Sequence, residues 1–116
     1  MGNRAVLDMD GKTGIYLHWN GDPISIASFL KVADDYQLRT DDYGIARFTQ
    51  IIGNWFGGAL SIGIGTLEDL DGMQDKNQAY VIRNWEVYTG ISVDSDSEMV
   101  AKIHSINDPI FLKEGA

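Results

Sequence analysis

The chain has 116 residues, enough for one hydrophobic core and too few for two ordinary domains, so we expect a single domain over residues 1–116. It contains 9 Lys and Arg and 17 Asp and Glu, which gives a net charge of -8. This charge repels nucleic acid and anionic membranes, so neither is expected as a partner. The absence of cysteine excludes disulfides, thiolate zinc sites and a cysteine nucleophile, and it suits a cytoplasmic protein.

A β-hairpin is predicted at the start of the chain. Apolar residues recur within residues 3–9 and again within residues 15–19, and the segment Asp10-Gly11-Lys12-Thr13-Gly14 between them consists of turn-forming residues. Side chains alternate between the two faces of a strand. Tyr16 and His18 are therefore expected on one face of the second strand.

Two helices are predicted to follow the hairpin. Asp22 can cap the first, and the proline after it suits the first helical position, where its missing N–H costs nothing, so this helix is expected over residues 23–36. The second helix is expected to begin after Asp41 or Asp42 and to end at Gly57-Gly58, because apolar residues recur at helical spacing between these points.

The remaining strands are predicted from short apolar runs. Residues 59–65 alternate branched apolar residues with small ones, which is typical of a strand with one packed face. Residues 66–78 are acidic and rich in turn formers, so we expect a surface loop there. Residues 79–83 and 85–88 are predicted to form either two short strands or one strand with an irregularity near Asn84.

The patterns weaken towards the end of the chain. Ser95 or Ser97 can cap a short helix that runs to about His104, and Asn107-Asp108-Pro109 is expected to break it. The apolar residues of the tail, residues 90–116, are more than a small core needs. We therefore predict that this tail forms the interface of a homo-oligomer.

These elements predict an α+β fold. The order of strands and helices lacks βαβ alternation, which favours a mostly antiparallel sheet of four or five strands with two helices packed on one face. The residues expected in the core are Val6, Leu17, Phe29, Ile45, Phe48, Ile52, Leu60, Ile62 and Val81.

Motifs that suggest catalysis do not form a complete set. The run Asp8-Met9-Asp10-Gly11 resembles the first motif of haloacid-dehalogenase phosphatases, but the later motifs of that family do not follow, and aspartates are ordinary turn residues. Gly11-Lys12-Thr13 lacks the earlier glycine of a phosphate-binding loop, and Asp69 and Asp71 lack the spacing of a calcium loop. We therefore expect no enzyme, no cofactor and no metal site.

A candidate ligand site lies at the end of the second strand. The residues Tyr16, His18, Trp19 and Asn20 combine planar rings with hydrogen-bonding groups, which can stack on a base and read its edge. The alternative is that Trp19 belongs to the core and that Asn20 only turns the chain. Pairing of the hairpin would bring Arg4 close to this cluster. A guanidinium at Arg4 or at Arg47 on the second helix could bind phosphate, although both can instead pair with carboxylates.

Several linked segments within residues 2–88 carry a family resemblance. They are Gly2-Asn3-Arg4-Ala5-Val6, Ile15-Tyr16-Leu17-His18-Trp19-Asn20-Gly21, Ala46-Arg47-Phe48, Ile52-Gly53-Asn54-Trp55-Phe56-Gly57-Gly58, Tyr80-Val81-Ile82 and Trp85-Glu86-Val87. Together they resemble small proteins encoded by phages, prophages and plasmids, a family without an established activity. The resemblance implies a mobile-element protein that acts inside a bacterial host cell.

Three functions are compatible with these observations. The first is an anti-defence protein that sequesters a small nucleotide-derived immune signal without catalysis. The second is an acidic inhibitor that binds a host defence protein or mimics nucleic acid, because the net charge is -8 and Glu68, Asp69, Asp71 and Asp75 cluster in sequence. The third is a small hydrolase or lyase that uses His18 or Asp8 as its base.

Overall fold

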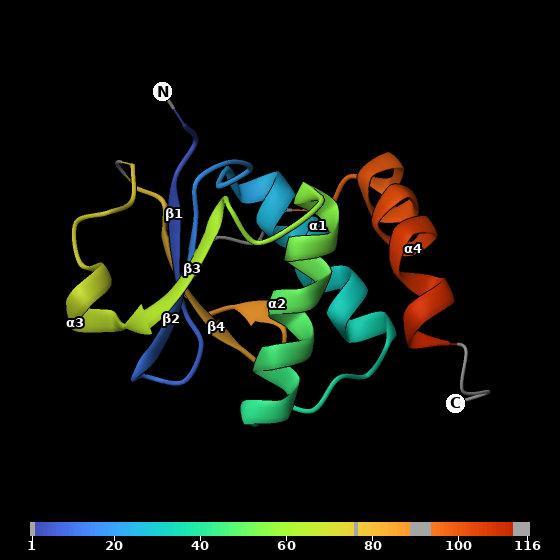
Figure 1. Cartoon of the computed structure of the whole chain (residues 1–116), viewed down its shortest axis with the longest axis horizontal. Coiled ribbons are helices and arrows are strands. Elements are labelled where there is room, and N and C mark those ends of the chain that lie inside the picture. The colour runs from blue at the N-terminus through green and yellow to red at the C-terminus, as the bar shows by residue number, and fades with distance from the viewer. Residues whose placement is uncertain (1, 76, 89–93, 113–116) are drawn as a thin grey trace.

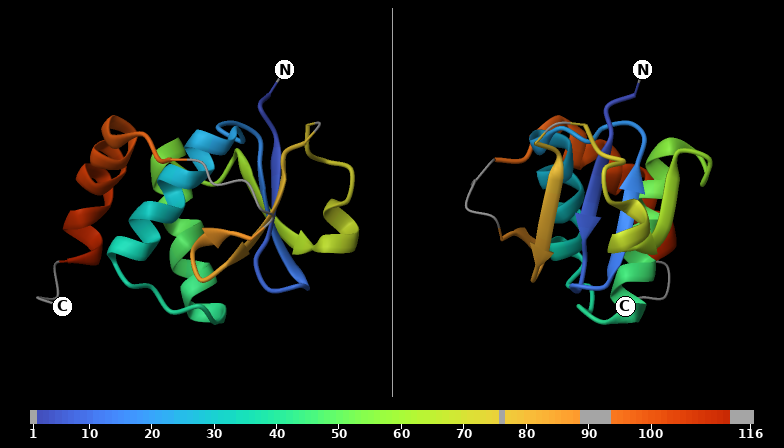
Figure 2. Two further views of the ribbon diagram at one scale, coloured as in Figure 1. Left: turned by 180° about the vertical axis from the view of Figure 1, so that it is seen from behind. Right: turned by 90° about the vertical axis from the view of Figure 1, so that its left-hand side faces the viewer.

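A single sheet with helices on both sides organises the molecule (Figure 1). The computed structural model describes residues 2–75, 77–88 and 94–112. The strands are β1 (Ala5–Asp8), β2 (Thr13–Leu17), β3 (Ile62–Thr66), β4 (Ala79–Arg83) and β5 (Glu86–Val87), and the helices are α1 (Pro23–Asp35), α2 (Asp42–Phe56), α3 (Leu67–Leu70) and α4 (Ser97–Phe111). Helices α1 and α2 cover one face of the sheet, α4 packs outside them, and α3 lies on the other side (Figure 2).

The sheet has five strands in the order β3-β2-β1-β4-β5. The pairs β1–β2, β2–β3 and β4–β5 are antiparallel, which confirms the predicted α+β fold with a mostly antiparallel sheet. The prediction of two helices on one face is only partly right, because α3 lies on the other face and α4 packs outside α1 and α2. The pair β1–β4 is parallel, which the sequence did not predict. Because β3 and β4 lie on opposite sides of the hairpin, the chain crosses the sheet between them. Part of that crossover is the short helix α3, where a loop was expected.

The ends of the first two helices follow the predicted capping residues. The Asp22 side chain accepts a hydrogen bond from the Ser25 backbone N–H, and the Asp41 side chain accepts one from Gly44. Gly57 ends α2 with φ 78°, a left-handed conformation that favours glycine. The predicted boundaries of both helices are therefore confirmed to within one residue.

The core lies between the sheet and the two covering helices. The residues predicted there that are buried in this core are Leu17, Phe29, Ile45, Phe48 and Ile52. Val6 is also buried, but on the other face of the sheet, where it pairs with Tyr16. Ile62 is partly buried against this cluster, and Val81 is partly exposed because it lies on the other face of the sheet. The prediction for Leu60 is wrong, since its relative exposure is 103%. The turn that follows Gly57-Gly58 extends to Ser61, so Leu60 precedes the strand in which it was expected.

A two-residue turn joins β4 to β5. Asn84 and Trp85 both have positive φ, at 52° and 60°, as a type I′ turn requires. This conformation is strained for a residue as bulky as tryptophan. The Trp85 indole N–H donates to the Leu38 carbonyl at 2.8 Å, and its ring packs on Phe48 with centroids 5.0 Å apart. These contacts hold the hairpin against α2. The chain reverses at Asn84 and Trp85, which confirms the alternative of two short strands.

The break predicted at Asn107-Asp108-Pro109 is wrong, since α4 continues through Pro109 to Phe111. Asn107 is fully buried and accepts a hydrogen bond from the Asn54 side chain at 2.8 Å. Phe111 stacks on Tyr36 with centroids 4.9 Å apart. These contacts with α1 and α2 hold the last turn of α4 in place. The tail residues 94–112 therefore pack on their own chain, while residues 90–93 and 113–116 lie outside the described residues.

A polar cluster lies where α4 meets α1. His104 contacts Asp35 through Nε2 at 2.8 Å and Asp108 through Nδ1 at 3.0 Å, and Tyr36 donates its hydroxyl to Asp108. Burial alone would lower the pKa of His104, but the two carboxylates outweigh it and raise the pKa above its ordinary value. A charged His104 therefore stabilises the docking of α4.

No helix among the described residues is long and apolar enough to cross a membrane.

We expect Phe48→Ala to lower the free energy of unfolding by about 3–5 kcal/mol, because Phe48 is fully buried and its removal leaves a cavity. Arg47→Ala is the matched control on the same helix, and its exposed side chain predicts a change within about 0.5 kcal/mol. Urea unfolding followed by circular dichroism measures both values. Equal losses for the two variants would contradict this assignment of the buried face of α2.

We also expect the His104 cluster to make stability depend on pH. Because the folded pKa of His104 is raised, its contribution is complete below the ordinary value of 6.5 and is lost as pH rises through the folded pKa. Relative to His104→Gln, the wild type should be most stabilised below pH 6.5 and should lose that advantage as the pH is raised above this ordinary value. Urea unfolding across this range measures the difference. Lys102→Gln, a control at an exposed position of α4, should follow the wild-type profile.

Candidate functional site

The candidate site lies on the face of the sheet that α1 and α2 do not cover. Ala5 and Leu17 pair in the β1–β2 ladder and are buried under the helices. Their neighbours in sequence point the opposite way, because side chains alternate along each strand. Arg4 and Tyr16 therefore share the open face, together with His18 at the end of β2.

Arg4 is fixed by Asp75 from the crossover between β3 and β4. Its backbone N–H donates to one carboxylate oxygen at 3.0 Å, and Nε and Nη2 donate to the other at 3.0 and 2.8 Å. The hydrogen bond and charge of Asp75 raise the pKa of Arg4, and the Arg4 backbone N–H, followed by its side chain, lowers the pKa of Asp75. Asp75 thus orients the guanidinium, whose Nη1 has no partner among the described residues.

The aromatic part of the site is formed by three neighbouring rings. The Tyr16 hydroxyl shares a hydrogen bond of 2.8 Å with Nδ1 of His18. The His18 ring meets the Trp19 indole edge-on, with centroids 5.0 Å apart. Trp19 is 44% exposed, so its ring presents apolar surface to solvent. Gly2 lies against His18 so closely that a Cβ atom there would be 2.9 Å from Nε2.

Asn20 has a structural role in the turn between the sheet and the helices. Its Nδ2 donates to Ser25 Oγ, and its Oδ1 accepts from the Trp55 indole, both at 3.3 Å. Its φ of 57° lies in the left-handed region that asparagine tolerates. Gly21 follows, and its carbonyl accepts the Tyr80 hydroxyl at 2.8 Å. Because both ends of the Asn20 amide are engaged within the chain, we place this residue outside the candidate site.

Arg47 lies apart from the other predicted site residues. It is exposed on α2, in the layer that covers the opposite face of the sheet. Its guanidinium carbon lies 5.6 Å from the centre of the Tyr43 ring, and that of Arg39 lies 4.9 Å from the same ring. The sheet therefore separates Arg47 from Arg4, and the two guanidinium groups do not converge on one phosphate.

Three polar residues near Arg4 were not among the predicted site residues. They are Asp75, Gln78 and Asn3. The Gln78 amide donates to Asn3 Oδ1 at 2.7 Å and to the Arg4 carbonyl at 2.8 Å. Asn3 in turn donates to Asp22 at 3.1 Å. These partners lie up to 75 positions apart in the chain, so no local pattern links them.

The aspartates of the first hairpin are turn residues. Asp8 Oδ1 accepts from the Gly11 backbone N–H at 2.7 Å, and Asp10 accepts from the backbone N–H groups of Lys12 and Thr13 at 2.9 and 2.6 Å. The Thr13 bond is the main cause of the lowered pKa of Asp10. These contacts are those of turn residues, as expected for the segment Asp8-Met9-Asp10-Gly11. Within residues 2–75, 77–88 and 94–112, no three His, Asp or Glu side chains are arranged to hold a metal ion.

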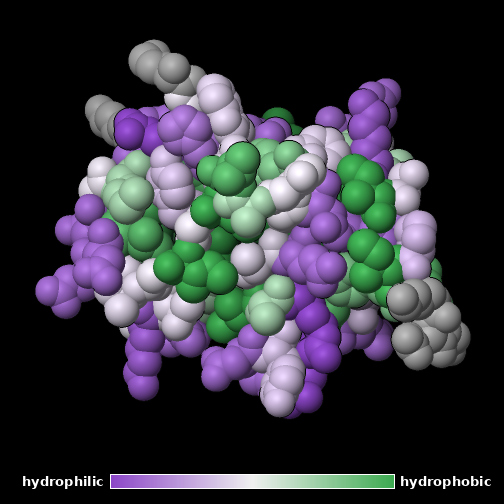
Figure 3. All heavy atoms as spheres, in the orientation of Figure 1, coloured by the Kyte–Doolittle hydropathy of each residue, from purple (hydrophilic) through white to green (hydrophobic). Residues whose placement is uncertain are grey.

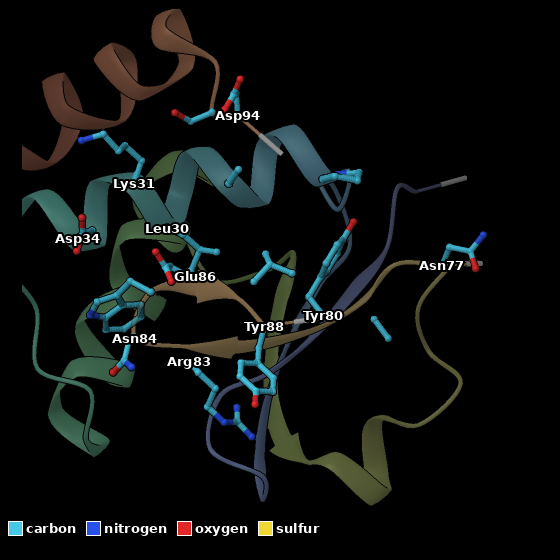
Figure 4. A pocket seen from close by; sticks show the side chains of 16 residues that line it. Leu30, Lys31, Asp34, Asn77, Tyr80, Arg83, Asn84, Glu86, Tyr88 and Asp94 are labelled. Atoms are coloured by element: carbon cyan, nitrogen blue, oxygen red, sulfur yellow. The ribbon is translucent and has the colours of Figure 1, made fainter. Parts of the chain in front are cut away.

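A groove of about 790 Å³ lies between α1 and the β4–β5 hairpin (Figure 4). Lys31 and Arg83 contribute the basic groups of its described lining, and none of the predicted site residues lines it. Lys31 pairs with Asp35, and Arg83 donates to the Asp8 carbonyl at 3.1 Å. Both cations are thus engaged with acceptors of this chain, as Arg4 is with Asp75.

Comparisons with known proteins do not identify a family. No family model, no curated protein and no solved structure is significantly similar to this chain. The resemblance to phage, prophage and plasmid proteins therefore stays a prediction from the sequence.

Proposed function

We propose that the chain is a non-catalytic binding protein that holds a small nucleotide-derived ligand on the open face of its sheet. The observation that supports this proposal is that an oriented Arg4 guanidinium shares one face of the sheet with Tyr16 and His18, and that the exposed Trp19 ring lies edge-on to His18. A nucleotide offers groups complementary to both, since its base stacks on aromatic rings and its phosphate accepts charge-assisted hydrogen bonds.

Each residue has a distinct role in this proposal. Trp19 supplies the stacking surface, which contributes about 1–3 kcal/mol per base. Arg4 supplies the donors at Nη1, and Asp75 keeps its guanidinium in one orientation. The Tyr16 hydrogen bond fixes the plane of the His18 ring, whose Nε2 lies beside Gly2. The ligand lies on an open surface, so recognition depends on stacking and hydrogen bonds.

The biological part of the proposal is sequestration of a bacterial immune signal by a mobile-element protein, and it rests on the sequence resemblance. A hydrolase or lyase acting on the same signal is distinguished by its product. A binding protein returns the ligand intact after heat denaturation, whereas an enzyme returns a changed molecule. We propose binding because Asp8 is held in the hairpin turn and Nδ1 of His18 is engaged by the Tyr16 hydroxyl.

The second candidate is an acidic inhibitor of a host protein. Its support is the exposure of Glu68, Asp69 and Asp71 at α3, on the side of the sheet opposite to α1 and α2. Asp75 does not add to this acidic surface, because Arg4 neutralises it. An inhibitor of this kind would bind a host protein and no nucleotide.

We expect the wild type to bind at least one member of a panel of cyclic ADP-ribose isomers and cyclic dinucleotides in isothermal titration calorimetry. Arg4→Ala should weaken that binding by about 10-fold or more, because a hydrogen bond to a charged group contributes about 1.5–3 kcal/mol. Trp19→Ala should weaken it by about 5-fold to 150-fold through loss of stacking.

Arg47→Ala is the matched control, because it removes the same charge from the other side of the sheet and should leave affinity unchanged. Circular dichroism and thermal melting of each variant establish that it is folded. Absence of binding by folded wild type would support the acidic inhibitor. Equal affinity in all variants would place the ligand elsewhere on the protein.

A further inference from the structure

The strand β3 forms one edge of the sheet, with β2 as its neighbour on one side and no described strand on the other (Figure 2). The His18 N–H donates to the Ser61 carbonyl at 2.8 Å, and the Leu67 N–H donates to the Lys12 carbonyl at 3.0 Å. Backbone groups of successive residues point to opposite sides of a strand. The backbone N–H and C=O groups of residues 61, 63, 65 and 67 therefore face β2. The backbone groups of Ile62, Ile64 and Thr66 face outward.

Two of the outward groups already have partners in their own chain. The Ile62 N–H donates to the Ala59 carbonyl at 3.3 Å. Thr66 is the N-cap of α3, so its carbonyl accepts the first hydrogen bond of that helix. Within the described residues this leaves the N–H and C=O of Ile64, the C=O of Ile62 and the N–H of Thr66 available at the edge.

This edge lacks the features that usually prevent strands from pairing. Proteins protect an exposed edge with charges, proline, bulges or short strands. Residues 48–67 contain no charged residue and no proline, and Ile64 is 60% exposed. Apolar side chains gather on the surface over β3 in Figure 3. The opposite edge, β5, has two residues and includes the charged Glu86.

The geometry points to a second copy of this chain as the partner of β3. In antiparallel pairing about a two-fold axis at Ile64, Ile64 exchanges both backbone bonds with Ile64 of the partner subunit. Ile62 then lies opposite Thr66 of the partner subunit. The available Thr66 N–H meets the available Ile62 carbonyl, and the two groups already engaged lie opposite each other. Each available group at the edge thus finds a complementary one, and the two sheets join into one.

Charge also favours a second copy over a partner recruited by electrostatics. Two chains of net charge -8 repel each other, and they approach most easily where no charges face each other. The uncharged segment 48–67 provides such a surface at β3. A basic partner would gain little along β3 itself, because residues 62–66 carry no carboxylate and the nearest ones, Glu68 and Asp69, lie in α3. The dimer does not depend on the proposed nucleotide site.

The first test is the solution mass from light scattering and sedimentation velocity at increasing concentration. We expect a dimer for the wild type and a monomer for Ile64→Pro and Ile64→Lys. Proline at this position removes an N–H that makes no bond within the sheet, and lysine adds a charge at the axis. Leu60→Lys, at a fully exposed residue before β3, is the control and should remain a dimer.

A second test uses the absence of cysteine from the chain. At the proposed axis the two Ile64 Cα atoms are about 5.5 Å apart, within reach of a disulfide. Ile64→Cys should therefore form a covalent dimer on oxidation, whereas Ile62→Cys should do so only when mixed with Thr66→Cys. A monomeric wild type, a dimer unaffected by both Ile64 substitutions, or equal cross-linking by Ile64→Cys and Ile62→Cys would overturn the inference.

Discussion

The alternation of side chains along the β1–β2 hairpin is the constraint on which the rest of the structure depends. The register that pairs Ala5 with Leu17 directs both into the core. The same register puts Arg4 and Tyr16 on the opposite face. A slip of one residue would exchange the two sets and expose the core residues. The hydrophobic effect that fixes the core therefore also fixes which polar groups meet on the open face.

The crossover from β3 to β4 decides how that open face is used. The chain must pass over the hairpin because β4 lies parallel to β1 on its far side. Leu70 covers part of the sheet on the way, packing where Gly14 has no side chain. Asp75 then reaches Arg4 and turns a mobile surface cation into an oriented one. The same route leaves β3 at the edge, so the candidate ligand site and the proposed dimer edge are consequences of one topology.

The sequence predicted the candidate site in part. Alternation was sufficient to bring Tyr16 and His18 together, and hairpin pairing was sufficient to place Arg4 near them. Asn20 was assigned to the site because its amide suits a base edge. Its partner Trp55 lies 35 positions further along the chain, so the structural role of that amide could not be read locally. Arg47 was included for its charge alone, and the sheet separates it from Arg4.

Local chemistry in the sequence determined the two long helices before β3, because their caps and apolar spacing act within a few residues. It also determined the α+β class and most of the core. Tertiary packing alone decided the parallel β1–β4 pair, the partners of Arg4 and the continuation of α4 through Pro109. Each of these depends on contacts between distant residues, such as Asn54 with Asn107. The hydrogen bonds of Asn107 and Asp108 and the stacking of Phe111 on Tyr36 together outweighed the local preference of proline to end a helix.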